Sequence, residues 1–297
     1  MGASDPSRLE AALAWLYVPA PRAGELLAKA AKVADGIVVD LEDAVHPRRR
    51  AAARQHLAEA LPAYDGAAFV VVRVNPVSTD DFAADIEALT PLVRAGLVLA
   101  VRIAKVESAA EVAVARAATA AWGPEPRLIC QLESAGAIAR AHEIAGADGV
   151  HSIMLGEADL RADLRLPRGA AGDPGLLLAR QTCVLASRAA GLPSPVGSAF
   201  TDVADAAGLH ETSLRLAGLG FVGRSCIHPA QPATVRAAFA PDPAEVAWAH
   251  SVLAEAGDQD GAGHAASVLD DGTFVDPAIV RQAERIAARA ELAGSRR

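Results

Sequence analysis

The sequence is poor in several residue classes, and each shortage excludes a class of protein. Aromatic residues make up only 4% of the 297 residues, so the core must consist mainly of Ala, Val, Leu and Ile. The three cysteines are odd in number and widely spaced, which favours neither a disulfide framework nor a zinc site and fits a reducing, cytoplasmic location. The chain has no apolar run of about 18 residues and no N-terminal signal-peptide pattern, so we expect neither a membrane span nor a membrane partner.

Long blocks of like charge are also absent. The longest is Arg48-Arg49-Arg50, and the net charge is -8. This balance argues against nucleic acid as a partner, and it means that an anionic substrate must be bound locally by a metal ion or an arginine. We interpret the arginine run as a solvated helix face, with contact to a phosphate group as the alternative.

Short apolar runs alternate with Ala-rich helical stretches over most of the chain. We expect strands at 15–19, 36–41, 68–74, 97–104, 127–132, 150–155, 194–198 and 221–226. Eight strands that alternate with helices predict an α/β protein with a parallel sheet, and eight strands close a (β/α)8 TIM barrel. A doubly wound open sheet is the alternative, but no G-x-G-x-x-G motif follows the first run.

The last part of the chain has a different pattern. We expect residues 1–240 to form the catalytic TIM barrel and residues 241–297 to form a C-terminal helical extension or lid. The Gly- and Asp-rich stretch 257–272 is typical of a mobile linker between two helices.

Charged and polar residues gather at the predicted carboxyl ends of the strands, where TIM barrels carry their chemistry. They are Asp40, Glu42, Asp43, Arg73, Asn75, Arg102, Lys105, Glu133, Asp159 and His228.

Two of these acidic residues follow consecutive strands. Glu133 ends the fifth run and Asp159 follows the sixth. Because neighbouring parallel strands lie about 4.8 Å apart, the two carboxylates can hold one divalent cation between them. Mg²⁺ is commonly bound by one or two carboxylates and water, so we predict that Glu133 and Asp159 are metal ligands. The alternative is that each carboxylate caps the helix that follows it.

Arg73 lies within the apolar third run, so we expect its guanidinium to be buried. It could pair structurally with Asp40 or Glu42, but the sharper hypothesis is that it binds a substrate carboxylate or thioester oxygen. Glu42 is a candidate catalytic residue, and we expect it, with Asp43, to organise Arg73 or metal-bound waters. His228, which precedes a proline, more often fixes a turn than takes part in chemistry.

The same stretches resemble a known family. They are Leu16–Pro19, Lys29-Ala30, Asp35–Val45, Val72–Asn75, Lys105–Ser108, Leu132–Ser134, Leu155–Leu160, Gly220–Arg224, Cys226–Gln231 and Gly272–Pro277. The chain resembles the citrate lyase β-subunit-like (CitE-like) group of the HpcH/HpaI aldolase/citrate lyase family. The resemblance covers nearly the whole chain in the expected order, and DLEDAV followed by IHPAQ is its most specific part.

The resemblance implies site residues. A TIM barrel with Mg²⁺, or alternatively Mn²⁺, held by Glu133 and Asp159 is expected, with Arg73 contacting substrate. The segment Gly156-Glu157-Ala158 beside Asp159 is expected to bind substrate. Asp276 matches a catalytic Asp that often comes from a neighbouring protomer of a trimer, so a homo-oligomer, trimer or hexamer, is expected. Without the resemblance, Asp276 followed by proline is typical of a helix N-cap.

The implied activity is metal-assisted cleavage or formation of a carbon–carbon bond. A β-hydroxyacyl thioester such as malyl- or citramalyl-CoA would give a 2-oxo acid and an acyl-CoA. Three alternatives stay open: a citrate lyase β subunit acting on an acyl-carrier-protein thioester, a pyruvate aldolase acting on free hydroxy-oxo acids, and a catalytically silent barrel.

The chain departs from the family pattern at three places. Ala20-Pro21 follows Pro19 where the family often has Pro-Gly, Ala104 precedes Lys105 where it often has proline, and Arg224 replaces a usual lysine. The first two changes affect loops that would shape the entry of CoA or another carrier, and they leave the predicted metal ligands intact.

Overall fold

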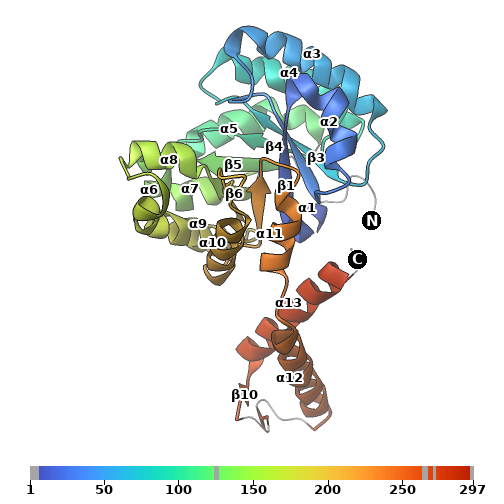
Figure 1. Ribbon diagram of the computed structural model, residues 1–297, viewed down its shortest axis with the longest axis vertical. Coiled ribbons are helices and arrows are strands. Elements are labelled where there is room, and N and C mark those ends of the chain that lie inside the picture. Colours follow the sequence, from blue (N-terminus) through green and yellow to red (C-terminus); the bar gives the residue numbers. More distant parts are fainter. Residues whose placement is uncertain (1–6, 124–126, 263–266, 270–271, 295–297) are drawn as a thin grey trace. The chain divides into compact units, whose positions relative to one another are not determined.

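The computed structural model describes residues 7–123, 127–262, 267–269 and 272–294. By their contacts the residues divide into two compact units, Met1–Ala238 and Phe239–Arg297. The first unit is built around a sheet of parallel strands surrounded by helices, and the second is largely helical (Figure 1).

Every expected strand is present in the first unit. The strands are β1 (Ala14–Pro19), β2 (Gly36–Asp40), β3 (Phe69–Val74), β4 (Ala100–Ile103), β5 (Leu128–Leu132), β6 (Val150–Leu155), β7 (Val196–Gly197) and β8 (Gly223–Cys226). They pair in parallel in the order β6-β5-β4-β3-β2-β1-β8-β7, with β1 between β2 and β8. This wrapping of the first strand onto the last, together with the surrounding helices, confirms the expected TIM barrel.

The barrel has one seam, between β6 and β7. The paired strand order begins at β6 and ends at β7. Ser198, directly after β7, bridges the gap: its hydroxyl donates to the carbonyl of Leu155 and accepts the backbone N–H of Glu157 at 3.2 Å.

Helices and short 3₁₀ turns connect the strands and cover the barrel. The α-helices are α1 (Ser7–Ala11), α2 (Ala23–Ala30), α3 (Arg50–Ala60), α4 (Asp80–Arg94), α5 (Ala109–Ala118), α6 (Ala135–Ala139), α7 (Ala141–Ala145), α8 (Glu157–Asp163), α9 (Leu177–Ala189), α10 (Ala206–Gly218) and α11 (Gln231–Phe239). The 3₁₀ turns are η1 (Ala20–Arg22), η2 (Pro47–Arg49), η3 (Leu61–Ala63), η4 (Ala120–Trp122) and η5 (Gly169–Leu176). None of the helices that the structure describes is long and apolar enough to cross a membrane.

The barrel interior has two layers, because alternate residues of a strand point inward. The apolar layer lies toward the strands' amino ends and consists of Leu9, Ala12, Trp15, Val38, Phe69, Val71, Ala100, Ile129, Met154 and Val196. The polar layer lies further toward the carboxyl ends and consists of Tyr17, Asp40, Arg73, Arg102, Gln131 and Glu133. The first five lie two residues beyond an apolar-layer residue of the same strand, and Glu133 lies four residues beyond Ile129. Strand register aligns Asp40 with Arg73 and Arg73 with Arg102, so these three side chains share one level.

Within its described residues, the second unit contains two helices and a hairpin. They are α12 (Pro243–Ala262), β9 (Ser267–Val268), β10 (Phe274–Val275) and α13 (Pro277–Gly294), and β9 and β10 pair antiparallel. The expected linker at 257–272 is wrong for residues 257–262, which continue α12 as helix. Residues 263–266 and 270–271 of that stretch lie outside the described residues.

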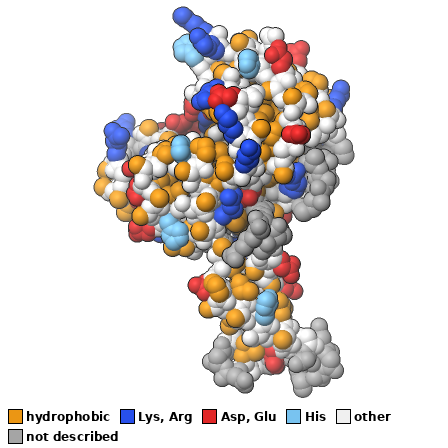
Figure 2. Space-filling view, turned by 45° about the vertical axis from the view of Figure 1, so that its right-hand side comes forward, with side chains coloured by type: hydrophobic (Ala, Val, Ile, Leu, Met, Phe, Trp, Pro, Cys, Tyr) orange, Lys and Arg blue, Asp and Glu red, His pale blue; other side chains and the backbone are white. Residues whose placement is uncertain are grey.

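The surface agrees with the mixed charge of the sequence. On the face shown in Figure 2, Lys and Arg side chains are interspersed with Asp and Glu side chains. Single hydrophobic side chains between them are normal for a protein surface.

Candidate metal and substrate site

The two predicted metal ligands lie at the carboxyl ends of adjacent strands. Glu133 follows β5 and is 4% exposed, whereas Asp159 lies in the first turn of α8 directly after β6 and is partly exposed. Burial raises the pKa of Glu133 to about 8, and the neighbouring carboxyl group of Asp159 adds to the rise. The structure therefore brings the two carboxyl groups together, and it places one of them where a negative charge needs a cationic partner.

Lys105 supplies a positive charge at this point. Its Nζ lies 3.7 Å from Glu133 Oε2, 3.4 Å from Asp159 Oδ2 and 3.4 Å from Asp43 Oδ1, and it forms an ion pair with Glu42 Oε1. Burial lowers its pKa, but the bond to Glu42 and the other carboxylates outweigh burial and hold the pKa above its ordinary value. Four carboxylates from three loops thus converge on one cation.

The sequence pattern predicts that Lys105 lies at a strand end, but it indicates no function for this residue. Its backbone is left-handed, with φ of 52°, which is uncommon for a residue other than glycine. This conformation ends β4 abruptly, and sequence patterns give little signal for it.

The donor atoms of Glu133 and Asp159 are of the type that a magnesium ion takes from a protein. Oε2 of Glu133 is buried and has no hydrogen-bond partner, only the Lys105 ammonium group at 3.7 Å, so it is incompletely satisfied for a buried carboxylate oxygen. Within the described residues, no group of three or more His, Cys, Asp or Glu side chains is arranged to hold a metal. Two carboxylates with open positions are what Mg²⁺ usually takes from a protein, the rest of its shell being water and substrate oxygens.

Gly156 makes room for this arrangement. A Cβ atom at this position would lie 2.5 Å from both Cγ and Oε1 of Glu133. Real Cβ atoms do not approach so closely, so any side chain at position 156 would displace the Glu133 carboxylate.

Arg73 is buried in the polar layer and is engaged by acidic neighbours. Its Nε donates to Asp40 Oδ1 at 2.7 Å, its NH2 donates to Asp40 Oδ2 at 2.6 Å, and its NH1 lies 3.1 Å from Glu42 Oε2. Burial alone would lower its pKa, but Asp40 and its other neighbours hold the pKa above its ordinary value. The structural pairing considered for Arg73 is therefore present, and its contact with substrate stays a prediction.

Glu42 organises Arg73, as expected. One carboxylate oxygen pairs with Arg73 and the other with Lys105. The side chain is 3% exposed, and burial raises its pKa. Its role in catalysis stays a prediction.

The predicted substrate-binding segment Gly156-Glu157-Ala158 spans the start of α8. The Glu157 carboxylate accepts two hydrogen bonds from Arg180, both of 2.8 Å, and the backbone N–H of Glu157 donates to Ser198. Glu157 therefore anchors α8 to α9 in this structure. Substrate contact by the segment stays a prediction.

Asp276 and His228 both make the local bonds expected of turn and cap residues. Asp276 Oδ1 accepts the N–H groups of Ala278 and Ile279 at 2.8 and 2.9 Å, which makes Asp276 the N-cap of α13. Its catalytic role stays a prediction. His228 Nδ1 accepts the N–H of Ala230 at 3.2 Å and so fixes a turn.

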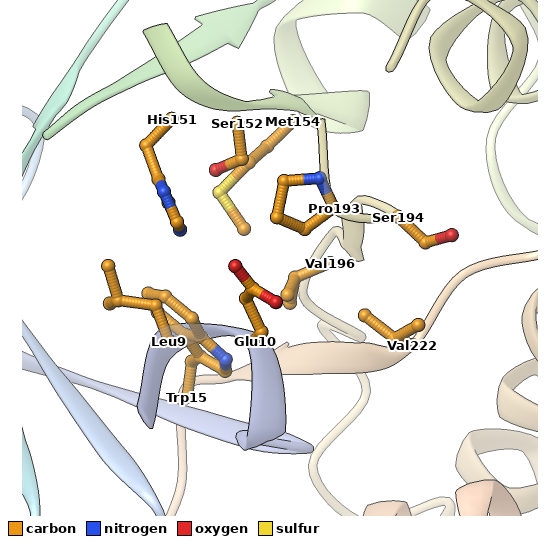
Figure 3. Close-up of a pocket in the computed structure, with 10 residues that line it drawn as sticks. All are labelled: Leu9, Glu10, Trp15, His151, Ser152, Met154, Pro193, Ser194, Val196 and Val222. Atoms are coloured by element: carbon orange, nitrogen blue, oxygen red, sulfur yellow. The ribbon is translucent and has the colours of Figure 1, made fainter. Parts of the chain in front are cut away.

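A small cavity lies at the opposite end of the barrel. It is lined by Leu9, Glu10, Trp15, His151, Ser152, Met154, Pro193, Ser194, Val196 and Val222 (Figure 3). Its volume of about 10 Å³ has room for roughly one water molecule. Burial lowers the pKa of His151 to about 4, so this imidazole is neutral at pH 7. Residues at this end of a TIM barrel serve stability, and we assign no chemistry to the cavity.

Comparison with known proteins gives concordant results. The sequence profile of the HpcH/HpaI aldolase/citrate lyase family matches residues 13–229. A citrate lyase subunit beta-like protein of Mycobacterium tuberculosis is 35% identical over 282 residues, which cover 93% of this chain and 94% of that protein. The L-malyl-CoA/beta-methylmalyl-CoA lyase of Rhodobacter capsulatus is 33% identical over 307 residues, 94% of each chain.

A solved structure shows the same architecture. The protein CitE of Mycobacterium tuberculosis, in complex with magnesium, acetoacetate and coenzyme A, has a TM-score of 0.76 and 34% identity to this chain. The match covers 95% of this chain and 99% of that one.

Proposed function

This chain belongs to the HpcH/HpaI aldolase/citrate lyase family, and we propose that it is a Mg²⁺-dependent carbon–carbon lyase. It cleaves a β-hydroxyacyl thioester, such as malyl-CoA or citramalyl-CoA, into a 2-oxo acid and an acyl-CoA, or runs the reverse condensation. The magnesium and coenzyme A in the Mycobacterium tuberculosis structure and the activity that names the Rhodobacter capsulatus relative support this proposal.

One observation in this chain carries the proposal: the buried Oε2 of Glu133, which has no hydrogen-bond partner, lies near the same Lys105 ammonium group as Asp159 at the barrel's carboxyl end. Glu133 and Asp159 would hold the magnesium ion there. When bound, magnesium supplies a Lewis acid that polarises substrate oxygens and offsets the negative charge that develops on them.

Arg73 is the proposed partner for the substrate's own negative charge. Asp40 and Glu42 fix its guanidinium inside the polar layer and keep it charged. A fixed charge is worth more than a mobile one, because it requires no reorganisation as the enolate forms.

The remaining steps need two proton transfers. A base takes the proton of the substrate hydroxyl, the electrons of that O–H bond form the new C=O, and those of the C–C bond pass to the thioester enolate. Asp276 is the proposed acid that protonates the enolate carbon, and it abstracts that proton in the condensation direction. Its position in the matching segment Gly272–Pro277 supports this role.

We also propose a homo-oligomer, trimer or hexamer, in which the second unit of one protomer delivers Asp276 to the barrel of the next.

A reducing, cytoplasmic location is part of the proposal and is supported by the state of the cysteines. Cys130, Cys183 and Cys226 are all free and buried.

A product assay tests the reaction. Purified protein is incubated with malyl-CoA or citramalyl-CoA and Mg²⁺, and 2-oxo acid and acyl-CoA are quantified separately. Equimolar formation of both products, abolished by EDTA, is expected. Release of free CoA without a 2-oxo acid would show thioester hydrolysis instead. If neither product forms from any CoA thioester, but an acyl-carrier-protein thioester or a free hydroxy-oxo acid is cleaved, the carrier proposed here is wrong.

A further inference from the structure

Arg102 is a buried cation whose position the proposed reaction does not explain. It lies on β4 inside the barrel and is 2% exposed. In the part of the chain that the structure describes, Arg102 forms no ion pair with an acidic side chain, unlike Arg73 on the neighbouring strand. A buried charge is costly without a partner, so the contacts that Arg102 does make are informative.

Arg102 contacts two uncharged polar side chains and one aromatic ring. Its Nε donates to Gln131 Oε1, its NH1 donates to Ser225 Oγ at 3.3 Å, and its guanidinium carbon lies 5.3 Å from the centre of the Tyr17 ring. These residues come from β5, β8 and β1, so Arg102 spans the barrel interior.

The bond to Gln131 fixes the direction of its amide group. A guanidinium only donates, so the carbonyl oxygen of Gln131 must face Arg102 and the NH₂ group must face the other way. That NH₂ group donates to Glu133 Oε1. Gln131 is 3% exposed, so water does not compete appreciably for either end of the amide.

This chain of bonds treats the two oxygens of Glu133 differently. Oε1 is held by Gln131 and lies against Gly156, where a Cβ would be 2.5 Å away. Oε2 is buried without a hydrogen-bond partner and lies 3.7 Å from Lys105 Nζ. Oε1 is therefore held by a hydrogen bond, and Oε2 is left without one on the side of Lys105 and Asp159.

We propose that Arg102 and Gln131 are positioning residues that orient the Glu133 carboxylate so that Oε2 alone is offered to a divalent cation. The proposal rests on the proposed metal site and adds to it a buried relay, Arg102–Gln131–Glu133. Hydrogen-bond partners of metal ligands typically contribute about 10- to 100-fold in metal affinity.

The test is a titration with Mn²⁺ alone, followed by electron paramagnetic resonance of free and bound ion. Gln131→Met keeps the side-chain length and removes both hydrogen-bonding groups, so it should weaken Mn²⁺ binding about tenfold or more and change the zero-field splitting of the bound ion. Arg102→Met should also weaken binding. The double variant should be no weaker than Gln131→Met, because both residues act through one oxygen.

Arg224 provides a matched control. It is also a buried barrel arginine, 5% exposed, but it contacts Thr212, Ser213 and the carbonyl of Ser198 rather than the site. Arg224→Met should leave Mn²⁺ affinity unchanged, which separates the relay from the general effect of losing a buried arginine. If Arg102→Met does not fold, Gln131→Met still decides the matter.

The outcomes separate the relay from the metal site itself. If the wild-type protein binds no Mn²⁺, or Glu133→Ala binds it as well as wild type, the proposed metal site is wrong. If Glu133→Ala abolishes binding while Gln131→Met binds Mn²⁺ like wild type, the metal site stands and the relay is overturned.

Discussion

The apolar and polar layers of the barrel interior are built from the same strands and differ in what they do. Along β2, β3, β4 and β5, the inward residue changes from apolar to polar in one two-residue step; the pairs are Val38 and Asp40, Val71 and Arg73, Ala100 and Arg102, and Ile129 and Gln131. The apolar layer gains free energy from burial, whereas buried charges gain little beyond their desolvation cost. The comparison indicates that the apolar layer stabilises the barrel, whereas the polar layer holds fixed charges at some cost in stability.

The largest effect should come from removing a carboxylate of the polar layer. Glu133→Ala should lower kcat/KM by about 1,000-fold or more, because the proposed metal site would lose its buried ligand. The thermal midpoint should change much less than turnover, since Oε2 of the Glu133 carboxyl group makes no hydrogen bond that the variant would lose. Turnover assays with and without Mg²⁺, and calorimetry, measure the two effects. Wild-type turnover by this variant would break the assignment of chemistry to the polar layer.

The corresponding substitution in the apolar layer should affect stability rather than turnover. Trp15 is 2% exposed and packs edge-on against Phe69 with ring centres 5.1 Å apart. Trp15→Ala should lower the free energy of unfolding by about 3–5 kcal/mol. Denaturant titration measures the loss, and turnover of the folded fraction should hardly change. A large fall in kcat/KM of the folded protein would show that the layers are not separate in function.

A third substitution tests whether the bidentate charge in the polar layer is functional. Arg73→Lys keeps the charge but cannot bridge Asp40 and Glu42 in the same way, so kcat/KM should fall by about 100-fold. Arg54 is a matched control, since it bridges Asp81 and Asp85 away from the site. Arg54→Lys should lower the thermal midpoint without changing kcat/KM. Equal kinetics for both variants would make Arg73 purely structural.

The last prediction concerns the pH dependence of stability. Because the folded-state pKa of Glu133 is raised to about 8, the folded metal-free protein binds this proton more tightly than the unfolded chain. Its contribution to stability is fully present below the ordinary glutamate pKa and is lost as pH rises through the folded-state value. Wild type should therefore lose stability relative to Glu133→Gln between about pH 4.5 and pH 8. Parallel stability curves for the two proteins in EDTA would contradict this account.

Most of the barrel could be predicted from the sequence, because buried parallel strands appear as short apolar runs. The boundaries were less certain for local reasons. Of the expected 194–198, only Val196–Gly197 is strand, since Pro193 and Pro195 have no N–H to donate to a ladder. Helix α12 continues through Gly257 and Gly261, although glycine is a weak helix former.

The site was predictable only in part. Glu133 and Asp159 could be paired because parallel strands place their ends at one edge. The gathering of four carboxylates around Lys105 depends on a left-handed backbone and on loops far apart in sequence. The relay from Arg102 through Gln131 depends on hydrogen-bond direction inside the barrel, which residue patterns do not encode.

The seam between β6 and β7 makes the barrel a ring that is closed by backbone pairing everywhere except at this one junction of the described strands. Elsewhere, adjacent strands are held by backbone ladders, but here the hydroxyl of Ser198 bridges the two edges with two hydrogen bonds. At about 1 kcal/mol net for each bond, opening the ring at its seam costs less than opening it through a ladder. The seam borders the strand that leads into Asp159, while Glu133 follows a strand paired on both sides. The seam therefore lies beside the strand that leads into the partly exposed Asp159, and not beside the strand that leads into the buried Glu133.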